Sequence, residues 1–257
     1  MLALPARIAG CREVILCTPC GRDGRIAPEI LYAADLCGVD RVFALGGAQA
    51  VAAMAYGTES IPRVDKIFGP GNRYVTKAKQ LAGAADVAVD LPAGPSEVLV
   101  LADEDARPEF AAADLLSQAE HGDDSQAVLV CRSEEFARRA IASVGEQAAR
   151  LSRREAIGNS LANSRIVVFS DPDEQIAFAD AYAPEHLIVA MRDAWDAAAR
   201  ITAAGSVFIG GYSPESAGDY ASGTNHTLPT GGWARAYSGV NLSLIHISEP
   251  TRLALIS

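Results

Sequence analysis

Long apolar runs are missing from this 257-residue chain. No stretch approaches the roughly 18–20 residues that a bilayer-spanning helix needs, so we expect no membrane partner. The first ten residues hold too short an apolar run for a signal peptide. Positive charge is also scarce, because 22 Lys and Arg stand against 32 Asp and Glu, for a net charge of −10. Binding to a nucleic-acid duplex requires a basic surface, and we therefore expect no nucleic-acid partner.

A disulfide framework is also missing, because the spacing of the cysteines matches none. The five thiols are an odd number, which favours a reducing compartment, and we expect a cytoplasmic protein. Cys17 and Cys20 form a lone CxxC pair, whereas a zinc ribbon would need a second pair. A loop-like stretch with two glycines follows Cys20, so we interpret both thiols as structural side chains at a strand end.

Short β-branched segments alternate along the chain with Ala-rich segments at helical spacing. The first kind predicts strands at residues 13–17, 41–45, 66–68, 87–90, 97–101, 127–131, 165–169, 186–190 and 206–209. The second kind predicts helices at residues 28–37, 47–56, 73–82, 107–120, 134–150, 173–182 and 193–203. This alternation predicts an α/β fold with largely parallel sheets, and the nearly continuous apolar strands predict helices on both faces.

Two prolines and a glycine interrupt the alternation at residues 91–96. We therefore expect one α/β domain over residues 1–96 and a second over residues 97–242. Residues 243–257 fit no preceding pattern and resemble the translated read-through of a sequencing adapter. We interpret them as an artefactual tail and exclude them, His246 included, from the expected fold.

The histidines outside that tail each lie in a dense polar cluster, which favours functional roles over purely structural ones. Gln118 and His121 are three residues apart near the end of a predicted helix, so they share one helix face. An amide oxygen and an imidazole nitrogen can both ligate a metal, and a polar helix end is the alternative. Glu185 and His186 start an apolar strand, where an acid and an imidazole at the mouth of a parallel sheet suit proton transfer. A solvated strand start is the alternative there.

The third polar cluster, residues 213–226, follows the last predicted strand as a long loop of small and polar residues. Such loops commonly carry function. Asp219 offers a carboxylate oxygen, and His226 offers a ring nitrogen. Two glycine-rich turns, residues 46–49 and 69–72, each open a predicted helix whose amide groups could face a phosphate. Tight turns between strand and helix are the alternative for both.

Six blocks in order give the sequence a specific resemblance to histidinol dehydrogenase, from about Met1 to Leu242. The blocks are GGAQA, KIFGPGN, PAGPSEVLV, DLLSQAEHG, YAPEHL and SPESAGDYASGTNH. The resemblance implies two incomplete Rossmann-like domains with largely parallel sheets, the first on the NAD side and the second catalytic and zinc-binding. It implies oxidation of L-histidinol to L-histidine in two NAD-dependent hydride transfers through a bound aldehyde. It also implies an intertwined homodimer with one Zn²⁺ per site.

The same resemblance implies roles for particular residues. Gln118, His121 and Asp219 correspond to zinc ligands, and Glu185 and His186 correspond to the acid–base pair. In this scheme His186 takes the hydroxyl proton, and Glu185 activates the water that hydrates the aldehyde. The implied substrate contacts are Ser96, Gln118, His121, His186 and Asp219.

The resemblance also extends to the cofactor and to sections outside the matched region. Gln49 and Asn72 correspond to NAD contacts. The family has an earlier section with an NAD-contacting tyrosine, and a later section with a substrate-binding glutamate and a histidine that reaches the partner's zinc. Neither section is matched in this sequence. We therefore expect this chain alone to bind zinc weakly and to show little turnover.

Two other functions remain open on the residues alone. A zinc hydrolase would use Glu185 or His186 to activate a metal-bound water, although the sequence has no HExxH signature. A non-catalytic α/β binding module would keep the histidines as structural side chains. A hydride assay separates the dehydrogenase from the hydrolase, and metal analysis separates both from the module.

Overall fold

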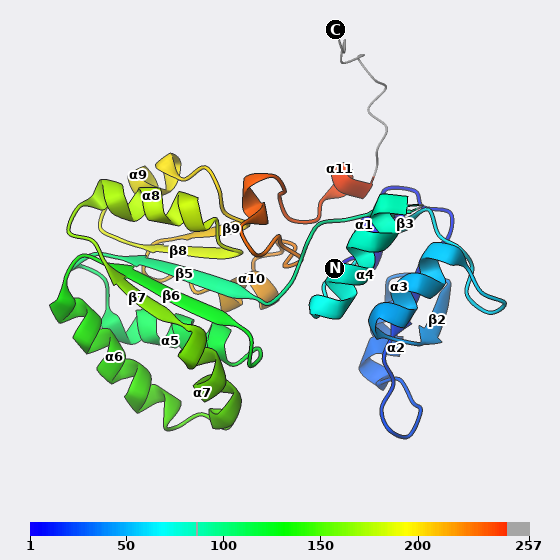
Figure 1. Ribbon diagram of the computed structural model, residues 1–257, viewed down its shortest axis with the longest axis horizontal. Coiled ribbons are helices and arrows are strands. Elements are labelled where there is room, and N and C mark those ends of the chain that lie inside the picture. The colour runs from blue at the N-terminus through cyan, green and yellow to red at the C-terminus, as the bar shows by residue number, and fades with distance from the viewer. Residues whose placement is uncertain (86, 246–257) are drawn as a thin grey trace, which may run out of the picture. The chain divides into compact units, whose positions relative to one another are not determined.

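The computed structural model describes residues 1–85 and 87–245 of the chain (Figure 1). The chain forms two compact units, one of Met1–Leu91 with the described residues from Val240 onward, and one of Pro92–Gly239. Residues 92–96, which precede the strand that begins at Glu97, belong to the second unit. Gly94 N–H donates to Thr230 Oγ1 at 2.7 Å, and Thr230 N–H donates to the Pro92 carbonyl at 3.3 Å. The compact units divide after Leu91, and the domains that we expected over residues 1–96 and 97–242 stay a prediction.

One five-stranded parallel sheet forms the centre of the second unit. Its strands are β5 (Glu97–Ala102), β6 (Gln126–Cys131), β7 (Arg165–Val168), β8 (His186–Ala190) and β9 (Ser206–Ile209). The strand order is β7-β6-β5-β8-β9, which is the order of a Rossmann fold without its sixth strand. The structure thus confirms an α/β fold with parallel sheets, and these strands lie within one residue of their predicted bounds.

Helices cover both faces of this sheet (Figure 1). On one face lie α5 (Pro108–Ala119), α6 (Glu134–Ala148) and α7 (Arg154–Asn163). On the other face lie α8 (Pro172–Tyr182) and α9 (Ala194–Arg200). Side chains of β5 alternate between the two layers, with Val98 and Val100 packed beside α5 and α6, and Leu99 and Leu101 beside α8 and α9. Burial on both faces explains why the strands are apolar throughout.

The first unit contains two separate parallel pairs of strands. β1 (Ile15–Thr18) pairs with β2 (Arg41–Ala44), and β3 (Lys66–Ile67) pairs with β4 (Ala88–Val89). Its helices are α1 (Ala3–Ile8), α2 (Pro28–Leu36), α3 (Gly47–Tyr56), α4 (Arg73–Ala85) and α11 (Leu242–Ile245). Its core consists of Val51, Ala55, Ile67, Ala82 and Val87. The first residues of the expected tail lie in α11, and residues 246–257 lie outside the described residues.

Two helices of the second unit were not expected from the sequence. The first, α7, contains one glycine and two asparagines, and it is held by Ile157, which packs against Leu116 and Ala119. The second, α10 (Ser216–Tyr220), lies inside the segment that we expected to be loop throughout, so that expectation was wrong for these five residues. Gly218 of α10 lies close to the ring of Phe208 in β9. A further short 3-10 helix spans Trp233–Arg235.

The cysteines of the chain all carry free thiols. Cys17 is partly buried in β1, and Cys20 is exposed in the loop that follows. This placement agrees with two structural side chains at a strand end. Within the described part of the chain, no helix combines the length and the apolar character needed to cross a bilayer.

Candidate active site

In the second unit, the predicted polar clusters lie at the amino-terminal ends of the sheet strands. His186 is the first residue of β8 and pairs with Val98 of β5 and Ser206 of β9. β5 and β6 are parallel and start side by side, because Glu97 pairs with Gln126. The connecting helix α5 therefore runs back from the carboxyl-terminal end of β5, and its last turn places Gln118 near the amino-terminal ends of the strands. Ligands of open α/β sheets usually bind outside the carboxyl ends of the strands. Glu185 and His186, which we expected at such a binding mouth, lie instead at the amino-terminal ends of the strands.

A group of oxygen and nitrogen ligand atoms forms beside the end of α5. His121 Nε2 lies 4.0 Å from Asp219 Oδ2. Glu215 joins them, and the ligand atoms of His121, Glu215 and Asp219 all lie within 4.8 Å of one another. His121 Nδ1 is 3.0 Å from the Ser117 carbonyl, so Nδ1 carries the hydrogen and Nε2 presents its lone pair. An imidazole nitrogen with carboxylate oxygens is a donor set that suits Zn²⁺.

The side-chain amide of Gln118 is buried beside this group of ligand atoms. Its side chain is 0% exposed, and neither Oε1 nor Nε2 has a hydrogen-bond partner among the described residues. Leaving a buried polar group unpaired costs about 1–3 kcal/mol, and such groups call for an explanation. Glu215 is similar, because Ser117 Oγ donates to its Oε2 at 3.1 Å while its Oε1 is buried and unpartnered among those residues. A bound cation or substrate would satisfy both groups.

The two candidate acid–base residues, Glu185 and His186, follow an unusual turn. α8 ends at Tyr182, and Ala183 takes a left-handed φ of 53° before Pro184 leads into β8. Glu185 Oε2 then lies 3.6 Å from His186 Nδ1. Burial raises the pKa of Glu185 to about 8 and lowers the pKa of His186 to about 4. Both side chains are therefore mainly neutral at pH 7, and the neutral imidazole can accept a proton.

Electrostatic contacts connect the ligand atoms around Asp219 with the Glu185–His186 pair. Asp219 Oδ1 lies 3.4 Å from His226 Nδ1, and Asp219 partly offsets the effect of burial on the pKa of His186. Positive charge on His121 and His226 acts against this and lowers the pKa of His186. The Ser96 side chain hydrogen-bonds to Glu185. The predicted residues Ser96, Gln118, His121, Glu185, His186 and Asp219 thus occupy one edge of the second unit.

Known proteins share this sequence and fold over nearly the whole chain. The family model for histidinol dehydrogenase matches residues 1–245. This chain belongs to the histidinol dehydrogenase family. It is 61% identical over 242 residues to the histidinol dehydrogenase of Bacteroides fragilis (strain YCH46), and 58% identical over 244 residues to that of Xanthomonas axonopodis pv. citri (strain 306). These matches cover 94% and 95% of this chain, and 56% and 57% of the relatives.

A solved structure of the same family has a similar fold. The crystal structure of histidinol dehydrogenase from Elizabethkingia anophelis matches with a TM-score of 0.91 at 54% sequence identity. The match covers 95% of this chain and 56% of that chain. The present chain therefore spans a little over half the length of the histidinol dehydrogenases that it resembles.

Two residues beside the candidate site, Glu215 and Glu97, were not predicted from the sequence. Glu215 lies in the third polar cluster, in which the sequence offered Asp219 and His226 as candidate ligands. Glu215 and Asp219 are four residues apart, and a helix would place them on one face. Because this segment was expected to be loop, that spacing carried no weight. Glu97, whose N–H donates to Glu185 Oε2 at 2.9 Å, gave no local signal beyond its position before an apolar strand.

The two residues matched to NAD contacts lie in the first unit. Gln49 is exposed in the first turn of α3, after Gly47 with its φ of 74°. Asn72 Oδ1 accepts the N–H groups of Tyr74 and Val75 at 3.1 and 3.2 Å, and it therefore caps α4. Both glycine-rich turns open helices, as predicted. The NAD contacts of Gln49 and Asn72 stay a prediction.

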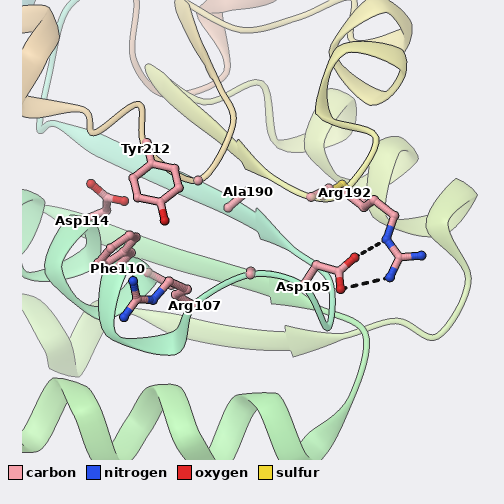
Figure 2. A pocket seen from close by; sticks show the side chains of 11 residues that line it. Asp105, Arg107, Phe110, Asp114, Ala190, Arg192 and Tyr212 are labelled. Atoms are coloured by element: carbon pink, nitrogen blue, oxygen red, sulfur yellow. Dashed lines mark hydrogen bonds and ion pairs between the residues drawn. The ribbon is translucent and has the colours of Figure 1, made fainter.

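A separate cavity of about 230 Å³ lies at the carboxyl ends of β5, β8 and β9 (Figure 2). The Arg107 guanidinium lies 4.4 Å from the centre of the Phe110 ring, and Tyr212 meets that ring edge-on at 5.4 Å. An ion pair between Asp105 and Arg192 borders the cavity (Figure 2). Its lining includes no residue that was predicted for the histidinol dehydrogenase site, so it is distinct from the candidate active site.

Proposed function

We propose that this protein is a zinc- and NAD-dependent dehydrogenase that oxidises L-histidinol to L-histidine in histidine biosynthesis. The observation that carries the proposal is the buried Glu185–His186 pair beside the ligand atoms of His121 and Asp219. Oxidation of an amino alcohol needs a base for the hydroxyl proton and a group that fixes the substrate amine. Membership of the histidinol dehydrogenase family supports this choice of substrate.

Gln118, His121 and Asp219 would hold zinc in this scheme. The unpartnered Gln118 amide and the close ligand atoms support the fit. Zinc, when bound, supplies a Lewis acid that fixes the pose of the substrate amine and imidazole. The proposed substrate contacts are Ser96, Gln118, His121, His186 and Asp219.

His186 and Glu185 divide the proton transfers. His186 accepts the hydroxyl proton in the first oxidation, because burial keeps its imidazole neutral. Glu185 accepts a proton from the water that hydrates the aldehyde, and its raised pKa makes the carboxylate a stronger base. His186 serves again in the second oxidation. Both side chains are 8% exposed, which limits access of water to the aldehyde.

The cofactor and assembly complete the proposal. We assign NAD, the acceptor of both hydrides, to the domain over residues 1–96, with Gln49 and Asn72 as contacts. The domain over residues 97–242 is then the catalytic one. The family resemblance supports a homodimer, and the free cysteines support a cytoplasmic location.

A hydride assay tests the proposal directly. A chimaera in which this chain replaces the matching segment of the Bacteroides fragilis relative supplies the rest of the family's length. With Zn²⁺, NAD and L-histidinol, we expect two NADH formed per L-histidine. The proposal fails if the folded, zinc-loaded chimaera forms no NADH. NAD-independent hydrolysis of an ester or amide substrate would indicate the hydrolase instead.

A further inference from the structure

Glu97 and Glu185 are neighbours at the amino edge of the sheet. The register pairs Val98 of β5 with His186 of β8, so the preceding residues, Glu97 and Glu185, are aligned as well. Adjacent strands lie about 4.8 Å apart, and side chains alternate between the faces of a sheet. The two carboxyl side chains therefore share one face at adjacent positions.

Hydrogen bonds hold the two glutamates in place. Glu97 N–H donates to Glu185 Oε2 at 2.9 Å, and Gly231 N–H donates to Glu97 Oε1 at 2.9 Å. The second oxygen, Glu97 Oε2, is buried and has no hydrogen-bond partner among the described residues. A buried, unpartnered carboxylate oxygen is costly, whereas a protonated one is much less so. The geometry therefore favours a proton at this position.

Among the described residues, no cationic side chain is paired with the two glutamates. Within the described ranges, no Lys or Arg forms an ion pair with either glutamate. Arg165 lines the same cavity of about 380 Å³ as Glu97 and Asp124, but its guanidinium donates to backbone carbonyls. The other titratable groups that face the pair are Tyr182, His186 and Glu215. Two ionised carboxylates in this setting would repel each other.

We propose that Glu97 and Glu185 act as one carboxyl pair that retains a proton at neutral pH, with Glu97 positioning Glu185 and strengthening it as a base. The proposal rests on the proposed function in one respect, because base strength matters only if Glu185 activates water. Neither the polar clusters nor the family resemblance gave Glu97 a role. It is a positioning residue, since it acts through Glu185.

The electrostatics of the site agree with this role. Burial raises the pKa of Glu97. Burial also raises the pKa of Glu185, with a further upward contribution from the negative charge of Glu97. A base is most effective when its pKa lies near the working pH. Glu97→Gln keeps the acceptor for Gly231 N–H and removes only the charge, so it isolates the electrostatic effect.

The test is a titration of the chain without substrate or metal. Glutamate labelled with ¹³C at the side-chain carboxyl reports each group by NMR, and Glu185→Gln identifies the Glu185 signal. We expect Glu97→Gln to move the Glu185 titration to lower pH by about 1 pH unit. The control, Glu135→Gln, removes an exposed carboxyl from α6 and should leave that titration unchanged. An unchanged Glu185 titration in folded Glu97→Gln overturns the proposal.

The reverse measurement covers a failure of Glu97→Gln to fold. Coupling between two titrating groups is mutual, so Glu185→Gln should move the Glu97 titration to lower pH by the same amount. No movement overturns the proposal equally. In the chimaera, Glu97→Gln should shift the acid limb of the aldehyde oxidation to lower pH. Coupled titrations without any NADH formation would refute the dehydrogenase function and leave the carboxyl pair standing.

Discussion

Two buried glutamines of the second unit differ in a way that separates function from stability. Gln118 and Gln175 are both 0% exposed. Gln175 Nε2 donates to the Ala102 carbonyl at 3.3 Å, and its Oε1 accepts from Arg132 at 3.4 Å. Gln118 has no such partner among the described residues. A protein that keeps an unsatisfied amide in its interior gives up stability, and function is the usual reason.

This contrast gives a paired prediction. Gln118→Leu should raise the free energy of unfolding by about 1 kcal/mol, because it removes an unpaired buried amide. The same change should lower zinc affinity at least tenfold, by loss of a ligand. Gln175→Leu should instead lower the free energy of unfolding by about 1–3 kcal/mol, because it breaks satisfied hydrogen bonds, and should leave zinc affinity unchanged. Urea unfolding and zinc calorimetry measure both, and equal effects of the two substitutions would contradict the assignment.

Kinetics of the chimaera should separate the roles of His186 and Glu185. His186→Asn should slow both oxidation steps by about 10²–10⁴-fold, because a general base is lost each time. Glu185→Gln should slow mainly the second step, since water is activated only after the aldehyde forms. Supplying the aldehyde directly isolates that step. Equal losses for Glu185→Gln in the two steps would rule out the division of roles.

Glu185 should also make stability depend on pH. Its pKa is raised to about 8 in the folded chain from an ordinary 4.5, so the folded state holds more protons between these values. Stability is therefore highest below pH 4.5 with respect to this group, and it falls as pH rises towards 8. The free energy of unfolding relative to Glu185→Gln should fall by up to about 1.4 kcal/mol per pH unit in that window. A difference that stays flat from pH 5 to 8 would contradict the buried, protonated carboxyl.

At the scale of elements, glycines in two helices occupy opposite situations. A Cβ on Gly218 of α10 would lie 2.8 Å from Phe208 Cζ, whereas a Cβ on Gly145 of α6 would meet nothing within 4 Å. Gly218→Ala should therefore displace α10 and cost about 1–3 kcal/mol. Zinc affinity should fall as well, because Asp219 lies on this helix. Gly145→Ala should stabilise by about 0.5–1 kcal/mol and leave zinc binding unchanged.

A second substitution checks the cause of the Gly218 effect. Phe208→Leu makes room for the added methyl group, so the double variant should recover zinc affinity and part of the lost stability. If the losses in Gly218→Ala persist unchanged in the double variant, the contact with Phe208 is not their cause.

The elements that the sequence predicted are those whose pattern is local. The five strands of the central sheet carry continuous apolar runs, and their bounds followed from those runs. α7 and α10 depend on distant partners instead, since Ser160 Oγ of α7 donates to the Ser125 carbonyl at 3.0 Å and Gly218 packs on Phe208. Helix propensity weighs little against such contacts. The sequence therefore missed both helices.

The candidate site was predicted by a different route, and only in part. Gln118, His121, Glu185, His186 and Asp219 stood out through polar clusters and a family resemblance. These residues meet at the amino-terminal ends of the strands because of the strand order and because α5 runs back to that end of the sheet. No local sequence pattern encodes either feature. Glu97 became visible only through its alignment with Glu185. Such neighbours across strands require the register of the sheet.

On the scale of the whole molecule, each compact unit has its own buried cluster. In the first unit, Lys79 and Asp90 form a buried ion pair, and each is 4% exposed. Lys79 Nζ donates to the Gly69 carbonyl at 2.7 Å, and Gly69 N–H donates to Asp90 Oδ2 at 2.8 Å, so the pair holds the turn before α4. In the second unit, Ile157 of α7 is 1% exposed and packs against α5.

These clusters predict that damage stays within the unit that receives it. Lys79→Met leaves Asp90 buried without its cation, at a cost of about 3–5 kcal/mol, and should speed amide hydrogen exchange in α3 and α4. Ile157→Ala leaves a cavity, at a cost of about 2–5 kcal/mol, and should speed exchange in α5, α7 and β6. Exchange measured by mass spectrometry should show each effect confined to its own unit, because domains with separate cores open separately. If either substitution speeds exchange equally in both units, the chain unfolds as one cooperative body and the division into two independently stable units is wrong.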